Sequence, residues 1–371
     1  MTENRRRILK RDPNPHLFRP IKFRSVELKN RIMLSPMCQY SAIDGMPDDW
    51  HFVHLASRAV GGAALVFTEA THVSPQGRIT PHCLGIWNDA QRDAFCRIAD
   101  FIHMQGSVPG IQIGHAGRKA STNPPWDGAG PIQPQDPRGW QVIAPSSVPF
   151  DLGWQTPKTM DKSDIKKIYD QFALASRRSL EAGFKIIELH SAHGYLSHSF
   201  LSPLSNHRQD DYGGSLENRT RFLLETIDAI RSEWPSENPL FLRLSCTDWV
   251  KNGLTLQDTI KIAKLITKQG NVDLIDCSSG GNHPKQKIPV HPGYQIPFAE
   301  NIKRDVSIPT AAVGLLHSPD FCEEVIANQR ADLVVLGRTL LADPYWPLHA
   351  ATKLSAKKAN WPKQYERANI F

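Results

Sequence analysis

The chain has 371 residues, of which 40% are hydrophobic, so it is long enough for two average domains or one large barrel. Its formal net charge is +7, but the basic residues are dispersed apart from Arg5, Arg6 and Arg7, and no RNA-module or zinc-finger pattern is present, so we expect no nucleic-acid partner. No apolar run approaches the roughly 20 residues that span a bilayer, and none follows the basic N-terminal run as a secretion signal requires, which predicts a soluble, cytoplasmic protein with no membrane partner.

Short apolar runs alternate with amphipathic helical patterns along the first third of the chain. Residues 1–20 are predicted to be a lead-in, and the next segment alternates as a small N-terminal hairpin would, with strands at 21–23 and 26–28. Buried strands are predicted at 32–34, 64–69 and 108–113, with helices at 50–60 and 90–105 between them. From residue 114 to about 160 the chain is dense in Gly, Pro and Trp, which predicts a long ordered loop excursion after the third strand.

The same alternation resumes in the second half of the chain. Strands are predicted at 184–190, 240–244, 272–277, 310–313 and 332–336, and helices at 163–182, 215–234 with Ser215 as N-cap, and 255–269. Eight strand-and-helix units with right-handed crossovers predict an α/β fold, a single (β/α)8 TIM barrel over residues 21–345 followed by a C-terminal tail over 346–371. A doubly wound sheet is the alternative, but no Gly-x-Gly-x-x-Gly follows the first strand.

Two histidines and one tyrosine lie where the fourth barrel strand ends. In a barrel, this edge forms the mouth at which ligands bind. Neutral imidazoles of His190 and His193 can donate hydrogen bonds to one developing oxyanion, and a nearby phenol such as Tyr195 can transfer a proton. The alternative is that one histidine satisfies a hydrogen bond of the core and that the tyrosine only packs.

The seventh and eighth strands both end in glycine, at Gly314 and at Gly337, and Arg338 follows. In barrels, the loops after these two strands commonly bind phosphate through backbone N–H groups, and an arginine adds a charge-assisted contact. Gln112 and Arg243 are polar residues within apolar strands and need a ligand or an internal partner once buried. An amide and a guanidinium facing one cavity can read the edge of a heteroaromatic ring, whereas internal structural hydrogen bonds are the alternative.

Four sequence motifs follow one another along the chain. They are Ser35-Pro-Met-Cys38, Gln112-Ile-Gly-His-Ala-Gly-Arg118, His190-Ser-Ala-His-Gly-Tyr-Leu196 and Asp211-Tyr-Gly-Gly-Ser-Leu-Glu-Asn-Arg219. In this order they resemble the motifs of the Old Yellow Enzyme family of flavin reductases. Cys38 and the C-terminal Gln-Tyr-Glu-Arg resemble its thermophilic-like branch, the one typified by xenobiotic reductase A. The resemblance covers roughly residues 16–371.

The resemblance implies non-covalent FMN at the mouth of the barrel and NAD(P)H as the reductant. Cys38 would lie beside the reactive edge of the flavin, Gln112 and Arg243 on its pyrimidine side, and the glycines with Arg338 at its phosphate. The residues that the resemblance assigns to FMN are Ser35, Pro36, Met37, Cys38, Ala70, Gln112, Arg243, Gly314, Gly337 and Arg338.

The resemblance further implies an ene-reductase that reduces the activated C=C bond of small enone-type substrates, α,β-unsaturated carbonyl compounds, by a ping-pong mechanism. His190 and His193 would bind the carbonyl oxygen, Tyr195 would be the proton donor, and Tyr40 would line the substrate pocket.

In the resembling branch, a C-terminal Arg or Trp reaches into the active site of a neighbouring subunit. Trp361 and Arg367 are therefore candidate substrate-binding residues, and a homodimer or homotetramer is implied. A tail packed on its own barrel is the alternative.

Two other functions compete with this interpretation. A metal-dependent TIM-barrel hydrolase could use His190 and His193 with carboxylates from other strands as ligands. Against it, Arg243, beside Gln112, would point its guanidinium at a cation, and the six cysteines are scattered without the spacing of metal ligands, so we expect no metal site. A non-catalytic binding barrel would leave the residues at the mouth without a role.

Overall fold

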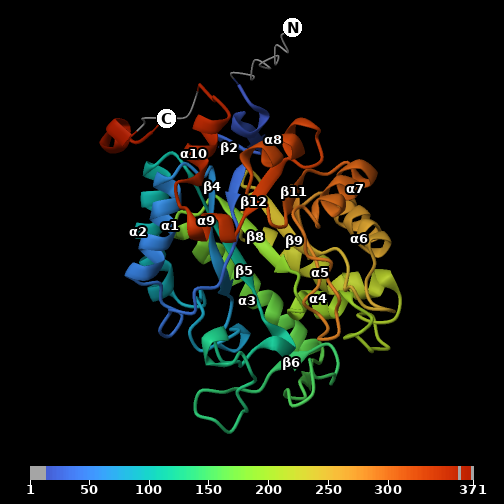
Figure 1. Ribbon diagram of the computed structural model, residues 1–371. Coiled ribbons are helices and arrows are strands. Elements are labelled where there is room, and N and C mark those ends of the chain that lie inside the picture. The colour runs from blue at the N-terminus through green and yellow to red at the C-terminus, as the bar shows by residue number, and fades with distance from the viewer. Residues whose placement is uncertain (1–13, 358–360, 369–371) are drawn as a thin grey trace.

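A closed barrel of eight parallel strands forms the centre of the protein (Figure 1). The computed structural model describes residues 14–357 and 361–368, so the basic run at residues 5–7 lies outside the described part. The strands pair around the barrel in the order β3-β4-β5-β8-β9-β10-β11-β12 and back to β3. Their bounds are β3 Ile32–Leu34, β4 Leu65–His72, β5 Val108–Gly114, β8 Ile186–Ser191, β9 Leu240–Ser245, β10 Leu274–Ser278, β11 Thr310–Val313 and β12 Leu333–Leu336.

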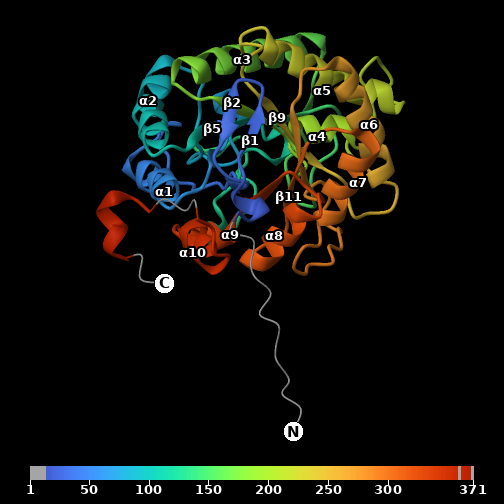
Figure 2. The ribbon, with the colours of Figure 1, turned by 90° about the horizontal axis from the view of Figure 1, so that it is seen from above.

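Helices surround this barrel as an outer ring, which Figure 2 shows from above. The arrangement confirms the predicted (β/α)8 fold and excludes the doubly wound alternative, because the sheet closes on itself. The ring consists of α1 Asp49–Val60, α2 Asp89–Met104, α3 Lys162–Glu181, α5 Leu216–Arg231, α6 Leu256–Gln269, α7 Ile296–Val306, α8 Pro319–Ala327 and α10 Trp346–Lys353.

The strand sequences explain how the barrel is filled. Alternate residues of a strand point to opposite faces. In β8, Ile187 and Leu189 pack with the helices, whereas Ile186 belongs to the separate cluster inside the barrel. The residues that point into the barrel change in the same way along β8, β9 and β10. Toward the carboxyl end of each strand, an apolar residue is followed by a charged one and then by one with a neutral hydrogen-bonding side chain. The inward residues are Ile186, Glu188 and His190 on β8, Phe241, Arg243 and Ser245 on β9, and Leu274, Asp276 and Ser278 on β10.

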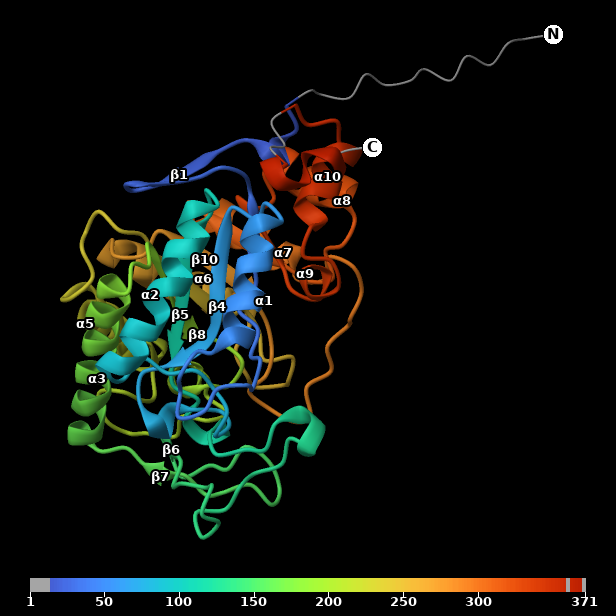
Figure 3. The same cartoon turned by 90° about the vertical axis from the view of Figure 1, so that its left-hand side faces the viewer.

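The two ends of the barrel are covered differently (Figure 3). The predicted hairpin is present as β1 Ile21–Phe23 and β2 Val26–Leu28, and it covers the amino-terminal end. Phe23 reaches inward, where its ring lies 5.0 Å from that of Phe241. At the opposite end, the excursion after β5 carries the short pair β6 Ile143–Ala144 and β7 Lys158–Thr159.

Several local details differ from the sequence prediction. β4 continues to His72 rather than ending at residue 69, because its pairing with β5 resumes at Ala70 after a register shift that follows Phe67. α5 ends at Arg231 rather than near residue 234, while Ser215 caps it as predicted by accepting from the backbone N–H of Asn218. The short helices α4 Leu196–Leu201 and α9 Arg338–Ala342 were not predicted, and no bounds were predicted for α7, α8 and α10. Within the described residues, no helix is long and apolar enough to cross a membrane.

Candidate active site

The loop after β8 brings the two predicted histidines together. His193 adopts a left-handed backbone conformation with φ of +60°, and Gly194 follows with φ of +76°. This turn places Nδ1 of His193 3.3 Å from Nε2 of His190. The ring of Tyr195 lies with its centroid 4.8 Å from that of His190 and 6.5 Å from that of His193. The predicted trio therefore forms one cluster at the mouth of the barrel.

Both imidazoles of this cluster are held neutral. Burial, followed by the positive charge of Arg243, lowers the pKa of His190 far below its ordinary value, and burial and the neighbouring His190 do the same for His193. Burial also raises the pKa of Tyr195 well above its ordinary value, so its hydroxyl stays protonated. The cluster can thus offer N–H and O–H donors without carrying a net charge.

Gln112 and Arg243 lie on β5 and β9, the two strands that flank β8, and each has a buried carboxylate as partner. Nε2 of Gln112 donates to Oε1 of Glu188 at 2.7 Å, and Nε of Arg243 lies 3.1 Å from Oδ2 of Asp276. The internal partners that the sequence interpretation left open therefore exist for both residues. Nη1 of Arg243 also donates to Oγ of Ser35 at 3.4 Å, which links it to the first barrel strand.

Glu188 and Asp276 were missed as members of the site. Both side chains are fully buried. Burial, followed by the negative charge of Asp276, raises the pKa of Glu188 to about 8, and burial also raises the pKa of Asp276 despite the attraction of Arg243. The signal that could have found them is an acidic residue at an inward position of an otherwise apolar strand.

Gly314, Gly337 and Arg338 line one cavity of about 370 Å³ at the ends of β11 and β12. Gly314 has φ of +137°, and a Cβ atom at this position would stand 3.3 Å from the backbone N of Gln295, so a side chain would intrude on the cavity wall. The structure thus brings the three predicted phosphate residues together. Tyr294, Gln295 and His317 also line the cavity and were not predicted.

The segment after β3 lies between this cavity and the histidines. A Cβ atom on Gly337 would lie 3.4 Å from Sδ of Met37 and 3.8 Å from Cβ of Ser35, so the ends of β3 and β12 approach closely. Pro36 is buried between Ser35 and Met37. Ala70 is buried and pairs in register with Gln112.

Cys38 and Tyr40 pack with Tyr195 in a small cluster above the barrel. A hydrogen bond with Cys83, together with burial, raises the pKa of the Cys38 thiol well above its usual range. The ring of Tyr40 meets that of Trp126 edge-on at 5.7 Å between centroids. Tyr40, which was predicted to line the substrate pocket, and Cys38, which was predicted to lie beside the flavin, thus share one wall with the tyrosine of the trio.

Lys119 is a further member of the site that the sequence interpretation missed. Its Nζ donates to the backbone oxygens of His193 at 2.9 Å and Gly281 at 2.8 Å, and it lies 5.3 Å from the ring centroid of Tyr195. Burial, followed by the charge of Arg118, lowers the pKa of Lys119 to about 7. Lys119 directly follows the motif at residues 112–118, and this position could have identified it from the sequence.

Trp361 and Arg367 do not join this cluster within one chain. The C-terminal segment lies beside α10, at the end of the barrel that carries β1 and opposite β6 (Figure 3). The ring of Trp361 lies 6.3 Å from that of His349 of α10, and Tyr365 meets Tyr345 at 5.9 Å between centroids. Arg367 is exposed in the short 3-10 helix Lys363–Ala368.

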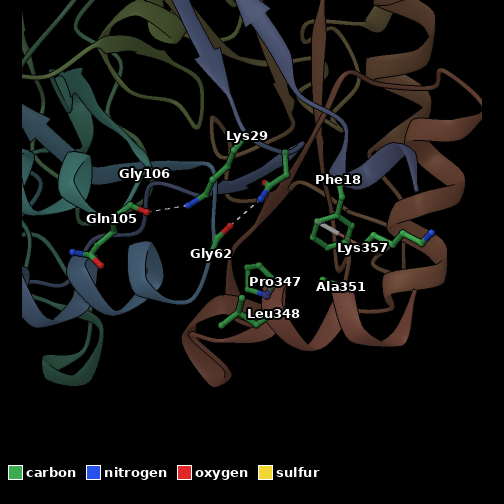
Figure 4. A pocket seen from close by; sticks show the side chains of 10 residues that line it. Phe18, Lys29, Gly62, Gln105, Gly106, Pro347, Leu348, Ala351 and Lys357 are labelled. Atoms are coloured by element: carbon green, nitrogen blue, oxygen red, sulfur yellow. Dashed lines mark hydrogen bonds between the residues drawn. The ribbon is translucent and has the colours of Figure 1, made fainter. Parts of the chain in front are cut away.

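A second cavity, of about 460 Å³, lies at the amino-terminal end between α10 and the loops before β3, β4 and β5 (Figure 4). Its Lys29 points toward Gln105 and donates to that residue's backbone oxygen at 3.3 Å and to Oγ of Ser107 at 3.1 Å. None of the predicted site residues lines this cavity.

The residues at the carboxyl-terminal mouth fit FMN by their chemistry. The cavity at Gly314 and Gly337 with the exposed Arg338 suits a phosphate, while Gln112 and Arg243 supply amide and guanidinium groups within the barrel. In contrast, among residues 14–357 and 361–368 no group of three or more His, Cys, Asp or Glu side chains is placed to hold a metal ion. The metal-hydrolase alternative gains no support.

Comparisons with known proteins agree with this geometry. Residues 16–357 match the NADH:flavin oxidoreductase / NADH oxidase family. An NADPH dehydrogenase of Geobacillus thermodenitrificans is 48% identical over 360 residues, covering 96% of this chain and 100% of the relative. An Old Yellow Enzyme homologue from Zymomonas mobilis superposes with a TM-score of 0.76 at 25% identity, covering 91% of this chain and 93% of that one. A 2-naphthoyl-CoA reductase gives 0.83 at 26% identity, covering 92% of this chain and 52% of the longer protein.

Proposed function

Because the chain belongs to the NADH:flavin oxidoreductase / NADH oxidase family, we propose that it is an ene-reductase acting on α,β-unsaturated carbonyl compounds. Membership makes the protein an NAD(P)H-dependent flavin oxidoreductase with FMN as its cofactor, in agreement with the Old Yellow Enzyme resemblance of its motifs. The choice of an activated C=C bond as the acceptor is the finer assignment, and it comes from the side chains at the mouth.

The distance of 3.3 Å between Nε2 of His190 and Nδ1 of His193 carries the proposal. Two neutral N–H donors this close can bind one carbonyl oxygen together and stabilise the negative charge that develops on it. Removal of one such donor typically costs 10²–10³-fold in rate, or about 3 kcal/mol. A carbonyl conjugated to the double bond develops this charge when hydride adds at the β-carbon.

Tyr195 supplies the proton that completes the addition. Its ring lies beside both imidazoles, so a substrate held by them places its α-carbon near the phenol. Its raised pKa keeps the hydroxyl protonated until the enolate forms. We propose that the proton arrives on the face opposite the hydride, which gives trans addition. Tyr40 shares a cluster with Tyr195 and would line the same pocket.

FMN, when bound, would supply the hydride-transfer chemistry that links the nicotinamide to the alkene. Arg243 and Gln112 would hold its pyrimidine side, the segment Ser35–Cys38 and Ala70 would line it, and Gly314, Gly337 and Arg338 would hold its phosphate. The nicotinamide and the alkene would occupy the space above His190 and His193 in turn, which makes the kinetics ping-pong.

We also propose a homodimer or homotetramer in which the tail serves a neighbouring subunit. The C-terminal segment packs beside α10, at the end of its own barrel away from the mouth, so Trp361 and Arg367 would bind substrate only across a subunit boundary.

Steady-state kinetics with 2-cyclohexenone and maleimide test the proposal. Double-reciprocal plots at several NADPH and NADH concentrations should give parallel lines. Stopped-flow measurement of Tyr195→Phe should then show a normal rate of flavin reduction and alkene reduction slowed by about 10²-fold or more. No turnover of either alkene by the yellow, NADPH-reducible protein would refute the ene-reductase assignment. Equal slowing of both half-reactions would remove Tyr195 from the proton-donor role.

A further inference from the structure

Ser278 contacts the histidine pair from the neighbouring side of the barrel. It is the last residue of β10, and its side chain is almost completely buried. Its Oγ lies 2.7 Å from Nε2 of His193. The other ring nitrogen of His193, Nδ1, faces His190. Each nitrogen of the His193 ring therefore has its own neighbour, and these neighbours decide which of the two nitrogens carries the proton.

The proton position on His190 follows from its backbone contact. The N–H of Ala192 donates to Nδ1 of His190 at 3.2 Å, so this nitrogen must be the acceptor. A neutral imidazole carries one proton on one of its two nitrogens. Since burial keeps His190 neutral, its proton is on Nε2, which faces His193. His190 is thus prepared to donate into the space between the two rings.

For His193, the proton position depends on Ser278. If Nε2 carried the proton, Ser278 would accept it and Nδ1 would present a lone pair to the space beside His190. A lone pair there would repel the oxyanion that the proposed reaction creates. If Ser278 donates instead, Nε2 becomes the acceptor and the ring proton must lie on Nδ1, next to the N–H of His190.

We propose that Ser278 is a positioning residue, which donates its hydroxyl hydrogen to Nε2 of His193 and holds that ring as the Nδ1–H tautomer whenever an oxyanion lies between the two histidines. The inference rests on the proposed function for the identity of that oxyanion, an enolate oxygen. Second partners of this kind commonly fix which nitrogen of a functional histidine carries the proton.

Other residues hold the backbone of His193, and Ser278 contacts its imidazole ring. The backbone N–H of His193 donates to Oγ of Ser245 at 2.9 Å, and Ser245 in turn donates to the carbonyl of Gly280 at 2.8 Å. Lys119 holds the carbonyl oxygen of His193. These bonds fix the peptide on both sides, whereas Oγ of Ser278 contacts the imidazole itself.

Nitrogen NMR of the FMN-loaded enzyme tests the tautomer directly. Protein labelled with ¹⁵N in its histidines is titrated with 4-chlorophenolate, a planar oxyanion that offers no activated double bond. Protonated and unprotonated ring nitrogens give widely separated signals, so the spectrum identifies the tautomer. We expect His193 of the wild type to carry its proton on Nδ1 in the phenolate complex. In Ser278→Ala the proton should move wholly or partly to Nε2, and phenolate affinity should fall about 10- to 100-fold.

Two further variants separate this role from general damage. Ser278→Thr keeps the hydroxyl and should restore both the tautomer and the affinity. Ser279→Ala removes the adjacent buried hydroxyl, which donates to Oε1 of Gln295 at 2.6 Å and not to a histidine, and should leave the His193 signals unchanged.

The proposal is overturned if the wild type binds no phenolate, if its His193 carries the proton on Nε2 in the complex, or if Ser278→Ala leaves the tautomer unchanged. None of these readouts requires turnover of an alkene. If the tautomer results hold while enones are not reduced, the proposed function fails and the role of Ser278 stands.

Discussion

Asp248→Asn should destabilise the loop that carries the histidine pair. Asp248 is fully buried, and each of its two oxygens has polar neighbours. Oδ1 lies 3.0 Å from Nε2 of His198, and Oδ2 accepts from Oγ of Ser202 at 2.6 Å and from the backbone N of Leu254 at 2.8 Å. Nδ1 of His198 accepts at 2.8 Å from the N–H of Gly194, so its Nε2 carries the proton toward Asp248.

The expected cost follows from this direction of donation. An amide has only one oxygen, so even in its better orientation Asn at this position turns an NH₂ group toward the N–H of His198. The variant loses the contact of this N–H with a charged acceptor, about 1.5–3 kcal/mol, and leaves a buried donor unpaired, about 1–3 kcal/mol. Together the two losses amount to about 2.5–6 kcal/mol. With an unfolding entropy of about 2.1 cal/mol/K per residue over 371 residues, Tm should fall by about 3–8 °C.

Thermal unfolding of the FMN-loaded proteins measures this effect. Burial alone would raise the pKa of Asp248, but His198 and the hydrogen bonds from Ser202 hold it below its ordinary value, so the carboxylate is ionised in the wild type at neutral pH. Asp93→Asn is the matched control, because Asp93 is exposed and pairs at 2.8 Å with Arg92 on the surface, a contact worth about 0–1 kcal/mol. Equal melting of Asp248→Asn and this control would refute the reasoning.

Three further substitutions test other parts of the site. His190→Ala should lower kcat/KM for 2-cyclohexenone about 10²–10³-fold while FMN content, read from absorbance, stays near that of the wild type. Arg338→Gln should weaken FMN binding about 10- to 100-fold in equilibrium dialysis, because a charge-assisted phosphate contact is lost. Burial and Asp276 raise the pKa of Glu188 to about 8, so the folded state keeps a proton that the unfolded chain releases, and stability should fall as pH rises from about 4.5 toward 8. Glu188→Gln should flatten that fall in urea unfolding across this range, and an unchanged slope would argue against a buried protonated Glu188.

The barrel could be predicted because its strands and helices have clear periods. The apolar runs of β8 and β9 are bounded by turns, and Ser215 is a strong N-cap, so their positions agree with the structure to within a few residues. The helix α4 escaped prediction because its six residues are all buried and include Ser197, His198 and Ser199, so it has no polar face to give a helical period.

Residues of the candidate site could be predicted where they end a strand, and were missed where their role depends on a partner. Gly314 and Gly337 could be predicted to lie together because strand ends converge in any barrel, and the structure places both at one cavity. Ser278 and Asp276 are ordinary residues of a strand until the register with β9 is known, since only then do they face His193 and Arg243. Distances across the barrel are set by tertiary packing, which a single sequence does not display.

The hairpin β1–β2 limits how reactants can reach the interior. Phe23 and Leu28 are buried within the same cluster as the inward residues at the bottom of the barrel, so the described structure leaves the approach at the carboxyl end. A reactant that enters there must also leave there. In the proposed reaction, spent nicotinamide therefore has to depart before an alkene can arrive, and a large excess of either compound should delay the entry of the other.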